Sequence, residues 1–216
     1  MNKINIVCVY KDQTNDSTPW QKYSEDDVDR LYRGVSRNIN MDFDFHCISN
    51  RETKYNTIPL VTDSDGFWNK VELFRKDLFN GPRLYFDLDV VICDDITPMI
   101  KSCTDSKLYM VEEPYRAIHN SSVMLWNQNY SDLYDNYVTN QADIVREHDD
   151  VTRQGVLGDQ AYIGENIEHN IIDKKYIDWE HHKVDCDYVD PTVLIFTGRK
   201  KPHLNQHLDV VKNNWI

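Results

Sequence analysis

Leu84-Tyr85-Phe86-Asp87-Leu88-Asp89-Val90-Val91-Ile92-Cys93 is the stretch of sequence that decides the fold. Its apolar, β-branched and aromatic side chains predict a buried strand, and the two-residue period of a strand places Asp87 and Asp89 on one face. Two carboxylates that close repel each other at low dielectric, unless one is protonated or a cation neutralises both. Because a hard divalent cation prefers oxygen ligands, we interpret the pair as a metal site. The alternative is two acids on the exposed face of an edge strand.

Strands and helices alternate along the whole chain. Strands are expected over residues 4–10, 43–47, 84–93, 107–111, 123–126 and 193–196, and helices over residues 24–39, 68–78, 131–145, from 158 onward and over 208–215. This alternation predicts one α/β domain over residues 1–216, with helices on both faces of the sheet. In such a sheet ligands bind at the carboxyl ends of the strands, which is where Asp87 and Asp89 are expected.

The bulk composition excludes several classes of partner. A net charge of −12 and a pI near 5.0 argue against a nucleic-acid backbone or an anionic membrane, because the longest basic cluster is residues 199–201. The five cysteines lack the spacing of a disulfide framework or a zinc site. No apolar stretch reaches the ~18 residues of a membrane span. We therefore expect a cytoplasmic protein with reduced thiols.

Further motifs carry a resemblance to a known family. Residues 67–75, the pair Gly81-Pro82 and the segment Tyr85-Phe86-Asp87-Leu88-Asp89 resemble nucleotide-sugar glycosyltransferases of the GT-A fold, in which an Asp-x-Asp motif closes a Rossmann-like first half. The segments that resemble motifs of glycosyltransferase family 8 are Asn120-Ser121-Ser122-Val123-Met124, Gly158-Asp159-Gln160, Phe196-Thr197-Gly198 and Lys201-Pro202. The resemblance implies a mixed sheet flanked by helices, with a nucleotide-binding half (1–92) and an acceptor and closing half (93–216).

The resemblance also implies a role for each matching position. Asp87 and Asp89 would hold Mn²⁺ or Mg²⁺ against the diphosphate of the donor, which in this fold is usually a UDP-sugar. The residues that would bind the nucleotide and its sugar are Val9, Tyr10, Lys11, Lys70, Asp87, Asn120, Gly198 and Lys201. Asp159 and Gln160 would face the reacting centre as catalytic residues. The alternative for Asp159 is a helix N-cap.

Lys70 and Ile195 stand out among the positions in and beside these segments. Trp68, Val71 and Phe74 recur at helical spacing and are expected in the core, whereas the ammonium of Lys70 needs a partner such as Asp87 or a phosphate. Family 8 enzymes have a metal-binding histidine where this chain has Ile195. His203, or His207 one helical turn later, is therefore the candidate third metal ligand, and a solvated surface histidine is the alternative.

The sequence thus predicts a metal-dependent glycosyltransferase that uses a nucleotide-sugar donor and an unknown saccharide or other hydroxyl acceptor. It leaves retention or inversion of the anomeric configuration open, and Glu112 or Glu113 is the candidate base for inversion. One alternative is a non-catalytic nucleotide-sugar or glycan-binding protein, which the absent histidine favours. Another is a phosphatase of the haloacid-dehalogenase type, whose nucleophile motif resembles Asp87-x-Asp89.

Overall fold

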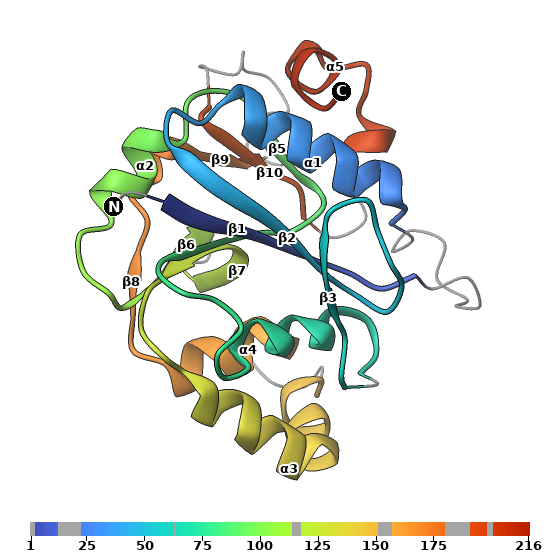
Figure 1. Ribbon diagram of the computed structural model, residues 1–216, viewed down its shortest axis with the longest axis vertical. Helices are drawn as coiled ribbons and strands as arrows, with labels where there is room; N and C mark the ends of the chain where they lie inside the picture. The colour runs from blue at the N-terminus through green and yellow to red at the C-terminus, as the bar shows by residue number, and fades with distance from the viewer. Residues whose placement is uncertain are drawn as a thin grey trace.

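The computed structural model describes residues 3–12, 23–62, 64–113, 118–150, 157–179, 191–197 and 201–216. A mixed sheet of seven strands forms its centre, in the order β3-β2-β1-β4-β7-β6-β8 (Figure 1). The strands are β1 (Lys3–Tyr10), β2 (Asp42–Ser49), β3 (Asn56–Pro59), β4 (Arg83–Phe86), β6 (Leu108–Glu113), β7 (Ile118–Trp126) and β8 (His169–Ile171). Neighbouring strands from β3 to β4 pair in parallel, as do β6 and β8, whereas β7 is antiparallel to both β4 and β6.

A second, smaller sheet and the helices cover the main sheet. The small sheet has the order β5-β10-β9 and consists of β5 (Val90–Ile92), β9 (Ile177–Trp179) and β10 (Val193–Ile195). The α-helices are α1 (Glu25–Arg37), α2 (Thr97–Ser102), α3 (Ser131–His148), α4 (Gly158–Asn166) and α5 (Asp209–Asn214), and the 3₁₀ helices are η2 (Gly66–Phe74), η3 (Lys174–Tyr176) and η5 (Pro202–Leu204). In Figure 1, α1 and the small sheet lie on one side of the main sheet and α3 and α4 on the other.

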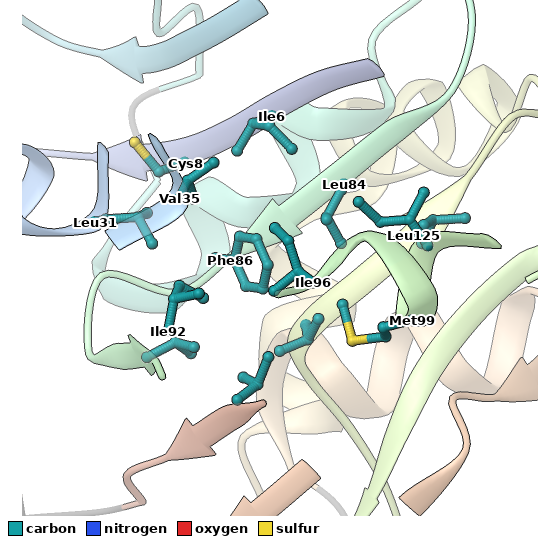
Figure 2. Close-up of a cluster of buried hydrophobic side chains, with 14 of the residues drawn as sticks. Ile6, Cys8, Leu31, Val35, Leu84, Phe86, Ile92, Ile96, Met99 and Leu125 are labelled. Carbon is teal, nitrogen blue, oxygen red and sulfur yellow. The ribbon is translucent and has the colours of Figure 1, made fainter. Parts of the chain in front are cut away.

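Each face of the main sheet has its own core because successive strand residues point to opposite faces. In β1, Ile4, Ile6 and Cys8 pack with α1 and the small sheet, whereas Val7 packs with η2, α3 and α4. Figure 2 shows part of the first core, where Phe86 lies among side chains from α1, β5 and the neighbouring strands. The sequence-based prediction of an α/β fold with both faces covered is therefore confirmed.

The start of α1 follows the predicted capping pattern. The backbone N–H of Ser24 donates to the Asp27 carboxylate at 2.8 Å, and the N–H of Asp27 donates to the Ser24 carbonyl at 3.0 Å. These contacts satisfy backbone groups that a helix start leaves without partners. The helix ends at Arg37, two residues before the predicted end.

The second predicted helix takes a different form. Residues 66–74 form the 3₁₀ helix η2 instead of an α-helix that runs to residue 78. Trp68, Val71 and Phe74 recur every three residues, which is the period of a 3₁₀ helix, so all three lie on one buried face. The backbone then becomes extended at Arg75, which ends the helix.

The prediction of one continuous strand over residues 84–93 is wrong. β4 ends at Phe86, and Asp87 to Asp89 form a turn in which the N–H of Val90 donates to the Asp87 carbonyl at 3.2 Å. β5 then leaves the main sheet and pairs with β10. The side chains before and after the turn favour strands equally, so the pattern does not reveal the change of sheet. Both aspartates nevertheless lie at the carboxyl end of β4, as expected.

We predict that the core beneath this turn is sensitive to loss of volume. Leu84→Ala should lower the free energy of unfolding by about 2–5 kcal/mol, because Leu84 is fully buried and its truncation leaves a cavity. Leu204→Ala is the matched control, since Leu204 is 59% exposed, and should change it by less than about 0.5 kcal/mol. Urea unfolding measures both, and equal effects of the two substitutions would contradict this description of the core.

Candidate active site

A cavity of about 570 Å³ opens along the edge of the main sheet at which β1, β4 and β6 end and β7 begins. Its walls come from these strand ends, η2, the start of α4 and the chain around β10. The residues that line it are Val9, Lys11, Tyr23, Gly66, Phe67, Asn69, Lys70, Tyr85, Asp87, Leu88, Asp89, Glu113, Ile118, Asn120, Ser121, Ser122, Leu157, Asp159, Gln160, Phe196, Thr197 and Lys201. Six of the segments singled out in the sequence therefore contribute residues to one cavity.

Asp87 lies at the centre of this edge. Its backbone N–H donates to the Ser122 carbonyl of β7 at 2.9 Å, and its carboxylate accepts from the Tyr85 hydroxyl and lies 3.1 Å from the ammonium of Lys70. Burial raises the pKa of Asp87, but the charge of Lys70 and the hydrogen bonds from Tyr85 and Lys70 outweigh it. The pKa therefore lies below its ordinary value, and this carboxylate stays ionised.

Lys70 connects two of the buried acids. Its ammonium, only 6% exposed, reaches from η2 to the Asp159 carboxylate at 3.0 Å and to the Ser121 hydroxyl at 2.8 Å. Burial lowers the pKa of Lys70, but the charges of Asp159 and Asp87 outweigh this effect and hold the pKa above its usual value. The predicted pairing of Lys70 with Asp87 is confirmed, and the same ammonium also serves Asp159.

Asp159 is the second acid of this cluster. The hydroxyl of Ser121 donates to its carboxylate at 2.8 Å. The residue that caps α4 is Leu157, so a helix N-cap is not the role of Asp159. Burial, followed by the charge of Asp87, raises the pKa of Asp159, although Lys70 opposes both. The carboxylate thus points into the cavity beside Lys70, away from the start of its own helix.

Asp89 has a separate set of partners. The hydroxyl of Tyr23 donates to its carboxylate at 3.0 Å, and the ammonium of Lys201 forms an ion pair with the same oxygen. Lys201 also donates to the Tyr23 hydroxyl at 3.1 Å. Burial raises the pKa of Asp89, and the nearby charge of Asp87 raises it further, whereas Lys201 lowers it. The two aspartates therefore bind different lysines, and their surroundings lower the pKa of Asp87 but raise that of Asp89.

The charges that line the cavity do not balance among the residues that the structure describes. They are the ammonium groups of Lys11, Lys70 and Lys201 and the carboxylates of Asp87, Asp89, Glu113 and Asp159. One formal negative charge is left over in a site whose carboxylates are largely buried. Carboxylate oxygens are the ligands that a hard divalent cation prefers.

The carboxylates of the cavity fit a divalent ion that takes most of its ligands from substrate phosphates and water. In the described ranges no group of three or more histidine, cysteine, aspartate or glutamate side chains could hold an ion by itself. Asp87 and Asp89 offer two oxygen ligands in one cavity. Mg²⁺ is commonly bound by one or two carboxylates together with substrate phosphates and water. The two aspartates suit such an ion, which would compete with Lys201 for Asp89.

The structure brings most of the predicted site residues together, but not all of them. Val9, Lys11, Asn120 and Gln160 line the cavity, whereas Tyr10 is 3% exposed and packs in the core between the sheet and α1. Strand alternation explains this difference, because Tyr10 and Val9 point to opposite faces of β1. Gly198 lies outside the described residues.

His203 does not join the aspartates in the described part of the chain. It is an exposed residue of η5, its ring centroid is 6.4 Å from that of Trp215, and it is not among the side chains that line the cavity. The third metal ligand expected from the sequence is therefore not supplied by this histidine in the arrangement observed.

Sequence reasoning missed two polar groups of the site. Tyr23 has no motif of its own, so nothing in the pattern connects it with Asp89 sixty-six positions later. Ser121 is part of a recognised segment, but its link from Lys70 to Asp159 depends on the packing of η2 against β7. Glu113, one of two candidate bases, lines the cavity, whereas Glu112 is exposed.

Structures of glycosyltransferases have the same fold as this chain. The galactosyltransferase LgtC in complex with donor and acceptor sugar analogues matches with a TM-score of 0.63 and 13% identity, over 97% of this chain and 93% of that chain. GlyE of Streptococcus pneumoniae TIGR4 matches with a TM-score of 0.64 and 11% identity, over 94% of this chain and 56% of that chain. The bifunctional glycosyltransferase WbbM matches with a TM-score of 0.66 and 8% identity, over 99% of this chain and 50% of that chain.

These similarities establish that the chain has the GT-A fold, the mixed α/β fold predicted from the sequence. No family model and no curated protein sequence matches it. Within the described residues, no helix is long and apolar enough to cross a membrane.

We predict that Lys70 is essential for stability. Lys70→Met leaves the buried Asp87 and Asp159 without their shared cation, and removing one partner of a buried ion pair costs about 3–5 kcal/mol. Lys54→Met is the matched control, because Lys54 is 57% exposed and pairs with Asp29 at the surface, where a pair contributes up to about 1 kcal/mol. Urea unfolding of both variants measures the difference.

The pH dependence of this effect has a definite sign. Lys70 holds the pKa of Asp87 below its ordinary value, so this stabilisation is present above the ordinary pKa and is lost as the pH falls through the lowered value. The stability difference between wild type and Lys70→Met should therefore shrink on acidification. A difference that grows at low pH, or a variant as stable as wild type at neutral pH, would contradict the described role of Lys70.

Proposed function

We propose that the protein transfers a sugar from a nucleotide-sugar donor, most simply a UDP-sugar, to a hydroxyl group of an acceptor. The observation that carries this proposal is the convergence of Asp87, Asp89, Asp159 and two lysines in one cavity at the carboxyl edge of a GT-A sheet. Ligands of open α/β sheets bind at this edge. LgtC, which has this fold, was solved with donor and acceptor sugar analogues.

The strand order suggests how a donor would lie. Because β1, β4, β7 and β6 are neighbours in that order, the cavity runs from Val9 and Lys11 through Asp87 to Asn120 and Glu113. A nucleoside at the β1 end places its diphosphate near Asp87 and Asp89. The donor sugar then lies beside Asn120, Asp159 and Gln160.

We propose that Mn²⁺ or Mg²⁺ binds with the donor. A diphosphate would add negative charge to a cavity whose described side chains already carry an excess of it. Asp87 and Asp89 would hold the ion, which when bound supplies Lewis-acid stabilisation of the charge on the departing diphosphate. Phosphate and water oxygens would complete its coordination, so that a histidine ligand is not required.

The protein's own residues would divide the remaining tasks. Lys201, whose ammonium lies beside Asp89, would bind a phosphate of the donor and stabilise the charge of the leaving group. Asp159 and Gln160 would face the anomeric carbon of the donor. A glutamine belongs to the active site of LgtC, since one structure is that of an active-site mutant in which glutamine is replaced by glutamate.

The non-catalytic alternative is separated from transfer by a simple assay. A binding protein would retain UDP-sugar but would not cleave it, whereas a transferase of this kind releases UDP slowly to water when no acceptor is present. The phosphatase alternative gains no support from the fold, because the acidic pair follows β4 in a GT-A sheet. Slow, Mn²⁺-dependent release of UDP from a panel of UDP-sugars is the expected result.

We predict that Asp89 is required for metal-dependent donor binding. Asp89→Asn keeps the size of the side chain and removes its charge, so UDP affinity in the presence of Mn²⁺ should fall by about 100-fold or more and UDP release should stop. Asp94→Asn, which alters an exposed acid of the following turn, should leave both unchanged. Calorimetric titration of UDP with Mn²⁺ decides, and wild-type affinity with the same metal dependence in Asp89→Asn would refute the role.

A further prediction concerns the competition for Asp89. Lys201→Met removes the ammonium that an ion must displace, and a hydrogen bond to a charged group contributes about 1.5–3 kcal/mol. Binding of Mn²⁺ alone should therefore tighten by roughly tenfold or more, whereas binding of UDP with Mn²⁺ should weaken because a phosphate partner is lost. Titration of the paramagnetic signal of Mn²⁺ reports the first effect without any turnover. Weaker binding of Mn²⁺ alone would exclude the competition.

A further inference from the structure

Phe67 has an exposure that is unusual for its position. Its side chain lines the cavity, yet the residue is 45% exposed. The other large apolar residues that are exposed in the described ranges lie outside the cavity, and they are Val61, Val138, Ile171, Leu204 and Ile216. An aromatic ring that remains exposed inside a binding cavity offers apolar area to a ligand.

The ring is held in place from behind. Gly158, the first residue of α4, has a φ of +68°, and a Cβ atom there would lie 2.4 Å from the Cε2 atom of Phe67. Glycine therefore meets two demands at this position, a left-handed backbone and close approach of the ring. The Trp68 ring, whose centroid is 5.9 Å from that of Phe67, adds a second support. A ring fixed in this way loses little freedom when a ligand binds.

The Phe67 ring lies near the proposed reacting centre. Gly158 directly precedes Asp159, and the carbonyl of Gln160 is hydrogen-bonded to the His119 ring of β7 at 3.0 Å. The start of α4 is thus tied to the β7 side of the cavity, where the donor sugar would lie. Phe67 contacts that start at Gly158 and leaves part of its ring exposed in the same cavity.

The surroundings of Phe67 specify the chemistry of that group. The cavity that Phe67 lines is also lined by amide and carboxylate groups, which include those of Asn120, Gln160 and Glu113. Apolar side chains such as Leu157 and Ile118 line the same cavity, but a lipid chain would also bury the cavity's charged and amide groups without hydrogen-bond partners. A pyranose ring has a face of C–H groups that stacks on an aromatic ring and a rim of hydroxyls that bind amides and carboxylates.

We propose that Phe67, backed by Gly158, is the stacking platform for a pyranose ring of a saccharide acceptor. The proposal rests on the proposed glycosyl transfer and adds the class of acceptor. Phe67 is then a specificity-determining residue that contacts the acceptor, and Gly158 is a positioning residue that acts through it.

Saturation-transfer NMR with a panel of methyl pyranosides of common hexoses, pentoses and N-acetylhexosamines tests the proposal, with UDP and the diamagnetic ion Mg²⁺ present. Wild type should bind at least one glycoside, with the strongest transfer to protons on one face of its ring. Phe67→Ala should weaken this binding by roughly tenfold, and Phe67→Tyr should restore it. Val138→Ala, which alters an exposed apolar residue outside the cavity, is the control and should bind as wild type does.

Gly158→Ala provides a second variant because its Cβ would displace the ring. It should weaken glycoside binding in the wild-type background and have little further effect in Phe67→Ala. No glycoside binding by wild type, or equal binding by wild type and Phe67→Ala, would overturn the proposal. So would a loss of UDP affinity in Phe67→Ala with unchanged glycoside binding, because the ring would then stack on the nucleobase.

A separate measurement tests whether the protein is a glycosyltransferase. Release of UDP from UDP-sugars by wild type, without an acceptor, reports on transfer and does not depend on glycoside binding. If wild type releases no UDP and yet binds a glycoside through Phe67, transfer is refuted and the saccharide site is upheld. If wild type releases UDP but binds no glycoside, transfer is upheld and the saccharide platform is refuted.

Discussion

The buried ammonium of Lys70 is the interaction on which the site depends. It joins Asp87 at the end of β4, Ser121 of β7 and Asp159 of α4 to the 3₁₀ helix η2. Without this cation, two carboxylates in a buried place would repel each other and would cost several kcal/mol to desolvate. One side chain therefore fixes the relative positions of four elements, and the cavity takes its shape from them.

The second lysine has a different character. Lys201, the residue directly before η5, pairs with Asp89. The Tyr23 hydroxyl is hydrogen-bonded to both side chains. The two acids of the Asp-Leu-Asp turn are thus treated unequally. Asp87 contacts Lys70 of η2 and the backbone of β7, whereas Asp89 contacts Tyr23 and Lys201 from distant parts of the chain. This inequality follows from the turn, because β5 leaves the main sheet directly after Asp89.

Strong local patterns made much of the fold predictable, but contacts between distant residues were not. A nearly continuous apolar run identified β1, alternating apolar residues identified β2, and the Ser24 cap identified α1. Asp87, Lys70, Asp159 and Gln160 were found because each lies in a recognisable segment. The change of sheet after Phe86 was missed because residues on both sides favour strands, and Tyr23 was missed because its partner Asp89 is distant in sequence. The short elements β3, β8, β9 and α2, of three to six residues, are too brief to show a period.

The contact between Lys201 and Tyr23 joins residues 178 positions apart. During synthesis the chain emerges from its N-terminus, so β1, β4 and the acidic turn are made well before residue 201. The loop that this contact closes is long, yet loop-closure entropy rises only slowly with length. Completion of the cavity therefore requires synthesis at least as far as Lys201, and a chain interrupted before that residue lacks the cation that pairs with Asp89.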